Sequence, residues 1–154
     1  MFHIVLVQPE IPQNTGNISR TCSVTGCALH LIKPLGFSID EPHVKRAGLD
    51  YWDTLDLKLH ESFEELFEEA GTDARFFFAT TKANNLYCEQ SYRNGDYLVF
   101  GRETAGLGEA FLSRYKNGHI RIPMLPGKRS LNLSNSVAIV LYEALRQTEF
   151  NDLI

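Results

Sequence analysis

Short apolar runs alternate with helix-like segments along the chain, and this alternation limits the fold more than any other feature of the sequence. The apolar runs have the length and composition of buried strands, and they occur at 3–8, 28–36, 74–81, 97–101 and 119–123. Helix-like patterns occupy 15–26, 62–70, 108–115 and a last segment that ends at residue 147. This order predicts an α/β fold with a mainly parallel sheet flanked by helices.

Length and composition indicate one domain. A chain of 154 residues suits a single domain over 1–154, and a hydrophobic content of 44% is enough to bury a core. No apolar run is long enough to span a membrane, and the first residues lack the basic region of a signal peptide. Neither the three cysteines nor the five histidines have the spacing of a metal site. We therefore expect a cytoplasmic protein without a metal ion.

The charge pattern limits how the chain could bind nucleic acid. A formal net charge of -4 argues against a protein that covers nucleic acid through bulk charge, although six carboxylates gather in 60–73 and leave room for a basic patch elsewhere. Basic side chains recur in the predicted loops, at Lys33, Lys45, Arg46, Lys82, Arg102, Lys128 and Arg129. With Tyr51 and Trp52 they could bind phosphates and stack a base; the alternative is solvated charges beside a core aromatic residue.

A glycine-rich segment, "LVFGRETAGLG", follows the strand at 97–101. Gly101, Gly106 and Gly108 would let the backbone approach a ligand closely, although an ordinary tight turn has the same composition. The segment lacks the Gly-Lys-Ser/Thr ending of a P-loop. No G-x-G-x-x-G follows a strand, which argues against a Rossmann-type NAD enzyme or methyltransferase.

The segment "PQNTGNISRT" places polar side chains at the beginning of the first predicted helix. Asn14 is a suitable N-cap, and Asn17 and Arg20 lie three residues apart on one face. A cation near a helix N-terminus does not stabilise the helix. Arg20 is therefore either a solvated side chain or a group directed at a phosphate or at a hydroxyl that loses its proton.

The last helix has two apolar faces. Its core face carries Val137, Val140, Leu141, Ala144 and Leu145. Ile139 and Tyr142 form a second apolar face, so the helix is either deeply buried or shared with a partner chain, and we favour a homodimer interface. The preceding "SLNLSN" can cap the helix with Ser134 or Asn135, and its other small polar residues indicate a polar ligand at the helix N-terminus.

Three stretches in this order resemble the SPOUT superfamily of methyltransferases, and more closely its TrmL (YibK) branch, the tRNA wobble-nucleotide 2′-O-methyltransferases. "PEIPQNTGNISRTC", "LVFGRETAGL" and "IRIPMLPGKRSLNLSNSVAIVLYEALRQ" resemble its first, second and third motifs, and "LHLIKPLGF" and "RAGLDYW" also fit. The resemblance covers almost the whole chain. It implies a SPOUT-type fold with a C-terminal deep trefoil knot, a rare exception to unknotted topology, and a homodimer through the C-terminal helix.

The resemblance also implies a site for S-adenosylmethionine, held in the knot by three loops. The cofactor-binding residues that it implies are Ala79, Gly101, Glu103, Ile122, Met124, Ser130 and Leu131. Arg20 corresponds to the proposed base for the ribose hydroxyl, or else it orients that hydroxyl, with Asn17 and Asn135 as polar supports. The RNA-binding residues would be Lys45, Arg46, Arg102, Arg129 and Tyr142. No metal is needed, because the sulfonium methyl is already activated.

The implied reaction is 2′-O-methylation of the wobble nucleotide, C34 or a modified U34, in the anticodon stem-loop of leucine-type tRNAs. The alternatives are another tRNA or rRNA ribose, a protein or small-molecule substrate, and a non-catalytic RNA-binding module. The second motif reads "GRETAGL", where relatives often have "GPETRGL", so Ala105 replaces an arginine and Arg102 is the residue that could compensate for it. This departure concerns the choice of tRNA more than cofactor binding.

Overall fold

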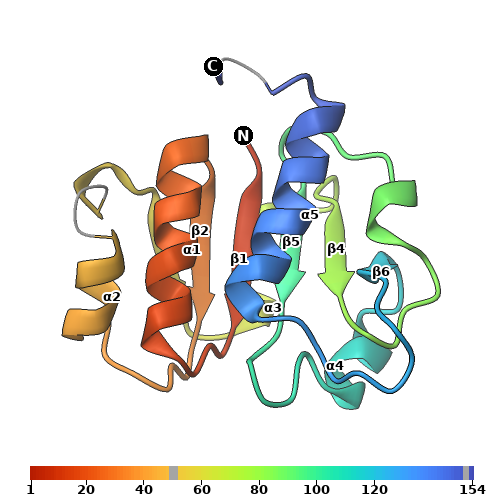
Figure 1. Ribbon diagram of the computed structural model, residues 1–154, viewed down its shortest axis with the longest axis horizontal. Helices are drawn as coiled ribbons and strands as arrows, with labels where there is room; N and C mark the ends of the chain where they lie inside the picture. The colour runs from red at the N-terminus through yellow and green to blue at the C-terminus, as the bar shows by residue number, and fades with distance from the viewer. Residues whose placement is uncertain (49–51, 151–152) are drawn as a thin grey trace.

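One parallel sheet organises the protein, as the alternating sequence pattern predicts (Figure 1). The computed structural model describes residues 1–48, 52–150 and 153–154. The sheet order is β3-β2-β1-β5-β4-β6, and every neighbouring pair is parallel. The strands are β1 (His3–Val7), β2 (Ala28–Ile32), β3 (Leu57–His60), β4 (Phe76–Ala79), β5 (Tyr97–Phe100) and β6 (His119–Ile120).

Helices cover both faces of the sheet. In Figure 1, α1 and α5 lie side by side in front of the strands with α2 next to α1, α3 lies behind, and α4 lies below the lower ends of the strands. Phe111 and Leu112 of α4 pack into the same core cluster as α3. The helices are α1 (Pro12–Thr25), α2 (Pro42–Gly48), α3 (Phe63–Ala70), α4 (Glu109–Arg114) and α5 (Leu133–Gln147), with 3-10 turns at Trp52–Thr54 and Tyr87–Glu89. The predicted α/β class is confirmed, while β3 and α2 were not predicted.

Alternation along the strands divides the core in two. Ile4 and Leu6 of β1 pack with α1 and α5, whereas Val5 packs with α3 and the segment around Leu107. All five residues of the predicted core face of α5 are buried in the first cluster: Val137, Val140, Leu141, Ala144 and Leu145. α5 is therefore an amphipathic helix, with one face buried in the core and the other exposed.

Two predicted helix caps and several strand ends were wrong: β4 spans Phe76–Ala79 and not 74–81, and β6 ends at Ile120 and not at residue 123. The N-cap of α1 is Ile11, whose side chain cannot accept a hydrogen bond, so Asn14 lies inside the first turn and is free for other contacts. The cap of α5 is Asn132, whose side chain accepts the Asn135 amide at 3.2 Å; neither Ser134 nor Asn135 is the cap. β2 ends at Ile32 and not at residue 36.

The chain crosses over itself beside β6. On one side of β6, Phe78 and Thr80 donate backbone hydrogen bonds to Gly118 and Ile120. On the other side, Arg121 donates to Asn85 and accepts from Tyr87. The segments on the two sides of the loop 80–84 therefore pair with opposite sides of β6, so this loop crosses from one side of β6 to the other.

Three histidines form a hydrogen-bonded row across the sheet face that α3 covers. His3 Nδ1 lies 3.0 Å from His30 Nε2, and His30 Nδ1 lies 3.0 Å from His60 Nε2. The row ends at Glu69, whose carboxylate lies 3.7 Å from His60 Nδ1, while the His3 ring stacks on Tyr97. Desolvation by burial, followed by the neighbouring His3, lowers the pKa of His30 to about 3.

We expect His30 to make stability fall as the pH falls. Between its ordinary pKa of 6.5 and about 3, the unfolded chain binds a proton at His30 that the folded chain does not bind. From this group alone, the free energy of unfolding should therefore decrease by about 1.4 kcal/mol for each unit that the pH falls below 6.5, down to about pH 3. Above pH 6.5 this loss is absent and the stability is complete. Urea unfolding across this pH range should show a shallower dependence for His30→Gln than for the wild type. An equal pH dependence of the free energy of unfolding in the two proteins would contradict a lowered pKa at His30.

Candidate active site

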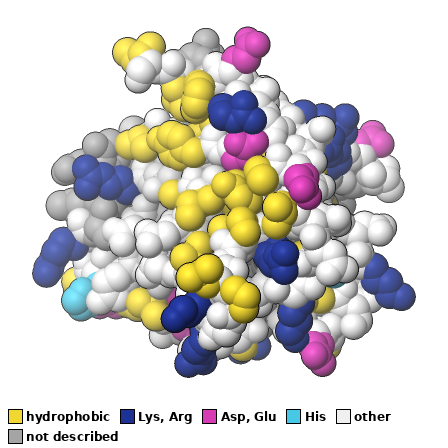
Figure 2. Space-filling view, turned by 45° about the vertical axis from the view of Figure 1, so that its right-hand side comes forward, with side chains coloured by type: hydrophobic (Ala, Val, Ile, Leu, Met, Phe, Trp, Pro, Cys, Tyr) yellow, Lys and Arg dark blue, Asp and Glu magenta, His cyan; other side chains and the backbone are white. Residues whose placement is uncertain are grey.

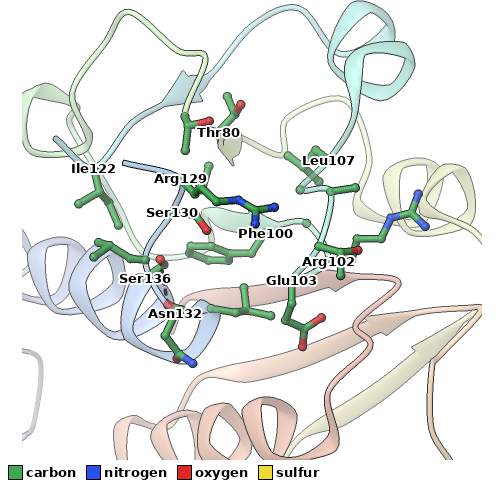
Figure 3. A pocket seen from close by; sticks show the side chains of 18 of the residues that line it. Thr80, Phe100, Arg102, Glu103, Leu107, Ile122, Arg129, Ser130, Asn132 and Ser136 are labelled. Carbon is green, nitrogen blue, oxygen red and sulfur yellow. Dashed lines mark hydrogen bonds between the residues drawn. The ribbon is translucent and has the colours of Figure 1, made fainter. Parts of the chain in front are cut away.

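A cavity of about 740 Å³ opens at the carboxyl ends of β4, β5 and β6 (Figure 3). Three loops line it: residues 79–82 after β4, residues 100–108 after β5, and residues between 122 and 136 that lead into α5. Ile11 and Asn14 add the beginning of α1. The carboxyl ends of parallel strands share one edge, where ligand sites of open α/β sheets occur. The resemblance had implied a cofactor site held by three loops.

The loop after β5 folds tightly on itself. The Gly106 amide donates to the Arg102 carbonyl at 2.9 Å, and Gly106 takes a φ of 62°, which favours glycine. A Cβ on Gly101 would lie only 2.1 Å from the Gly106 carbonyl carbon and 2.3 Å from the Leu107 nitrogen. Backbone packs directly against backbone here, so the wall of the cavity requires glycine at position 101.

A carboxylate from this loop supplies the cap that α1 lacks in its own sequence. Glu103 accepts hydrogen bonds from the Glu10 amide at 2.8 Å, the Ile11 amide at 3.0 Å and Asn14 Nδ2 at 3.2 Å. A negative charge at a helix N-terminus is favourable. Glu103 lines the cavity, as the resemblance implied, but Figure 3 shows its side chain directed towards α1.

The N-terminus of α5 is joined to the same cluster. Asn132 donates from Nδ2 to Asn14 Oδ1 at 3.1 Å, while its own Oδ1 caps α5 and accepts the Ser134 hydroxyl at 2.6 Å. Asn14 thus bridges Glu103 and Asn132. The three motif segments meet in one hydrogen-bonded network on one side of the cavity.

The structure brings together every residue that the resemblance implied for the cofactor. The cavity lining includes Ala79, Gly101, Glu103, Ile122, Met124, Ser130 and Leu131. Arg102 and Arg129 also line it. In Figure 3 the Arg129 guanidinium points into the cavity, whereas the Arg102 side chain extends away from it.

The three predicted catalytic residues lie outside that lining. Asn17 and Arg20 are exposed on α1, and Asn135 is exposed in the first turn of α5. Among the predicted RNA-binding residues, Lys45 and Arg46 are exposed on α2, and Tyr142 is exposed on α5. Tyr51 lies outside the described residues, and Trp52 is half-buried.

Several lining residues were not predicted for the site. Asn132 belonged to the polar run that was expected to bind a ligand, but Asn14 was assigned to helix capping, and Thr80, Phe100 and Leu107 looked like ordinary loop or core residues. Their only sequence signal was position, directly after a strand or before a helix. In the part of the chain that the structure describes, no group of three or more His, Cys, Asp or Glu side chains could hold a metal ion. None of the described helices is long and apolar enough to cross a membrane.

Sheet order, loop arrangement and sequence together define the class of the protein. The chain belongs to the SpoU rRNA Methylase family, whose model matches residues 1–142. Among its relatives, the tRNA (cytidine(34)-2′-O)-methyltransferase of Methylovorus glucosotrophus is 50% identical over 151 residues, which cover 97% of each chain.

Solved structures agree with this placement. One that is described as giving structural insights into the 2-OH methylation of C/U34 on tRNA is 48% identical, has a TM-score of 0.92 and covers 97% of both chains. The SpoU methyltransferase AviRb from Streptomyces viridochromogenes, in complex with the cofactor AdoMet, has a TM-score of 0.85 and covers 96% of this chain and 57% of its own. At 24% identity, that second likeness supports the fold alone.

Proposed function

We propose that this protein transfers a methyl group from S-adenosylmethionine to the ribose 2′-hydroxyl of nucleotide 34 in tRNA. The observation that carries the proposal is the cavity, which the three motif loops build in a chain that is 50% identical over almost its full length to an enzyme named for this reaction. Cytidine or a modified uridine in leucine-type tRNAs is the proposed target, and the cytoplasm is the proposed location.

The cavity suits a nucleoside cofactor. Its volume of about 740 Å³ lies within the range of about 300–1,000 Å³ that is usual for small-molecule sites. Phe100, Leu107 and Ile122 give it apolar walls, and the folded-back glycine loop exposes backbone groups that can bind polar edges of the ligand. When bound, S-adenosylmethionine would supply an electrophilic methyl group.

The residues of this chain would supply orientation and proton handling. A ribose hydroxyl is a weak nucleophile until its proton leaves, so a positioned side chain must accept or direct that proton. We assign this role to Arg20, with Asn17 and Asn135 as polar supports. Because an arginine side chain ordinarily keeps its proton, Arg20 would either act as a base with the help of a nearby RNA phosphate or orient the hydroxyl. Their exposed positions outside the cavity lining suit groups that meet the RNA rather than the cofactor.

We propose that RNA binds to one border of the molecule, where basic side chains lie. Figure 2 shows Lys and Arg side chains along the lower border of the molecule, the border at which the strands of Figure 1 have their carboxyl ends. Arg102 and Arg129 stand at the cavity and are proposed to bind phosphates, together with Lys45 and Arg46 of α2. Because Lys and Arg contacts with phosphates release counterions from the RNA, the complex should weaken with added salt.

A homodimer through α5 is part of the proposal. Ile139 and Tyr142 keep 36% and 46% of their surface exposed on the side of α5 that faces away from the core. Leu125 and Leu131, in the segment before α5, are also exposed. Figure 2 shows apolar side chains gathered across the face that carries α5. A second copy would cover this patch.

Transfer of labelled methyl groups tests the proposal. Purified protein would be incubated with labelled S-adenosylmethionine and either tRNA, rRNA or no RNA, and the product nucleosides would be identified. We expect label in a 2′-O-methylated nucleoside of tRNA alone. Label in rRNA alone would favour the reaction for which the family is named. Label without RNA, or no binding of S-adenosylhomocysteine in calorimetry, would refute the proposal.

A further inference from the structure

The carboxylates of Glu10 and Glu103 form reciprocal hydrogen bonds between two segments beside the cavity. Glu103 of the loop after β5 accepts the Glu10 amide, as described above. The side chain of Glu10 reaches back in the opposite direction and accepts the Thr104 hydroxyl at 2.6 Å and the Thr104 amide at 3.2 Å. Segments that lie more than 90 residues apart in the chain are thereby fastened by a reciprocal pair of contacts.

The backbone around Glu10 is held in one conformation. Gln8 at the end of β1 takes a φ of 53°, a left-handed conformation that non-glycine residues rarely adopt. The Gly36 amide donates to the Pro9 carbonyl at 3.0 Å, and a Cβ on Gly36 would lie 2.8 Å from Glu10 Cα. The backbone of Pro9 and Glu10 is therefore packed against Gly36, and the Glu10 side chain reaches Thr104 from this packed backbone.

The charge state of Glu10 suits this contact. The two hydrogen bonds from Thr104 lower the pKa of the Glu10 carboxyl, the hydroxyl bond having the larger effect. Glu10 is therefore ionised at neutral pH and accepts both donors. Thr104 itself lines the cavity, so the contact ends directly at the proposed cofactor site.

We infer that Glu10 is a positioning residue for methyl transfer: by holding Thr104, it keeps the cofactor loop 101–108 in register with the beginning of α1. That helix carries Asn17 and Arg20, the proposed groups for the ribose hydroxyl. Methyl transfer needs the hydroxyl, the methyl carbon and the sulfur in line, and small displacements between the two sides of the site are costly. The inference rests on the proposed function and assigns no contact between Glu10 and the substrate.

Substitutions at both ends of this contact test the inference. Thr104→Val keeps the shape of the side chain and the backbone bond but removes the hydroxyl donor, whereas Thr104→Ser keeps the donor. Glu10→Ala removes the acceptor. We expect Glu10→Ala and Thr104→Val each to lower kcat about tenfold, the effect of one hydrogen bond to a charged group, with a smaller change in KM for tRNA. Thr104→Ser, which keeps the hydroxyl donor, should recover most of the activity that Thr104→Val loses.

Controls separate positioning from folding and from the proposed function itself. Glu61→Ala removes an exposed carboxylate that pairs with Lys33 away from the cavity, and it should leave kcat unchanged. Thermal unfolding identifies a variant that has simply lost its fold. An inactive wild type would refute the proposed function. An active wild type with unchanged kcat in both Glu10→Ala and folded Thr104→Val would refute the role of Glu10 alone.

Discussion

Replacing Gly101 with alanine is expected to weaken the binding of S-adenosylhomocysteine by about 100-fold, because overpacking of this kind costs roughly 3 kcal/mol. The new methyl group would lie 2.1 Å from the Gly106 carbonyl carbon and 2.5 Å from its oxygen. Both are backbone atoms, so no side chain can rotate away, and the loop that walls the cavity must move instead. Calorimetric titration of the folded variant measures the loss.

Gly106→Ala is the matched control for this substitution. It lies in the same loop, and a Cβ there would meet no atom within 4 Å, although its φ of 62° disfavours alanine. We expect a stability loss of about 1–2 kcal/mol and a much smaller change in affinity than at position 101. Equal affinities for Gly101→Ala and the wild type would show that this loop does not form the cofactor wall.

Arg20→Ala is expected to lower the rate of methyl transfer by about 10²–10⁴-fold, the usual contribution of a general acid or base. Binding of S-adenosylhomocysteine should stay unchanged, because Arg20 does not line the cavity. The pair of measurements therefore separates a group that handles the ribose from one that holds the cofactor. Single-turnover transfer to tRNA measures the first quantity, and calorimetry measures the second.

Two further arginine variants sharpen this result. Arg20→Lys keeps the charge but loses the planar guanidinium, so it should recover little activity if Arg20 acts in a defined geometry. Arg114→Ala removes an exposed arginine of α4 that pairs with Glu64, and it should leave transfer intact. A loss of tRNA affinity without a loss of single-turnover rate in Arg20→Ala would make Arg20 an RNA contact and not a catalytic group.

Strand and helix periodicity predicted the sheet because most strands are buried runs with little ambiguity. The sequence pattern did not predict β3, because it is an edge strand in which Lys58 interrupts the apolar pattern. The pattern did not predict α2, because Val44 is the one fully buried side chain among the α2 residues whose burial is described. Periodicity identifies a segment by its buried face, and these two elements bury little.

The sequence likewise predicted only part of the candidate site. Residues such as Gly101, Ile122 and Ser130 could be assigned from motif resemblance, because they sit in the loops that build the cavity. The network around Asn14 and Glu103 could not, since a residue spacing of 89 carries no local signal for a hydrogen bond. Asn14 looked like a cap, yet it joins α1 to the other two motif segments through side-chain contacts that only the fold creates.

The most direct test of the proposed reaction removes a single oxygen atom from the substrate. Leucine-type tRNA would be prepared with the usual ribose at nucleotide 34 and, in parallel, with a 2′-deoxyribose at that nucleotide alone. We predict transfer of labelled methyl to the first tRNA and none to the second, with binding of both. Equal labelling of the two would place the methyl group elsewhere and contradict the account.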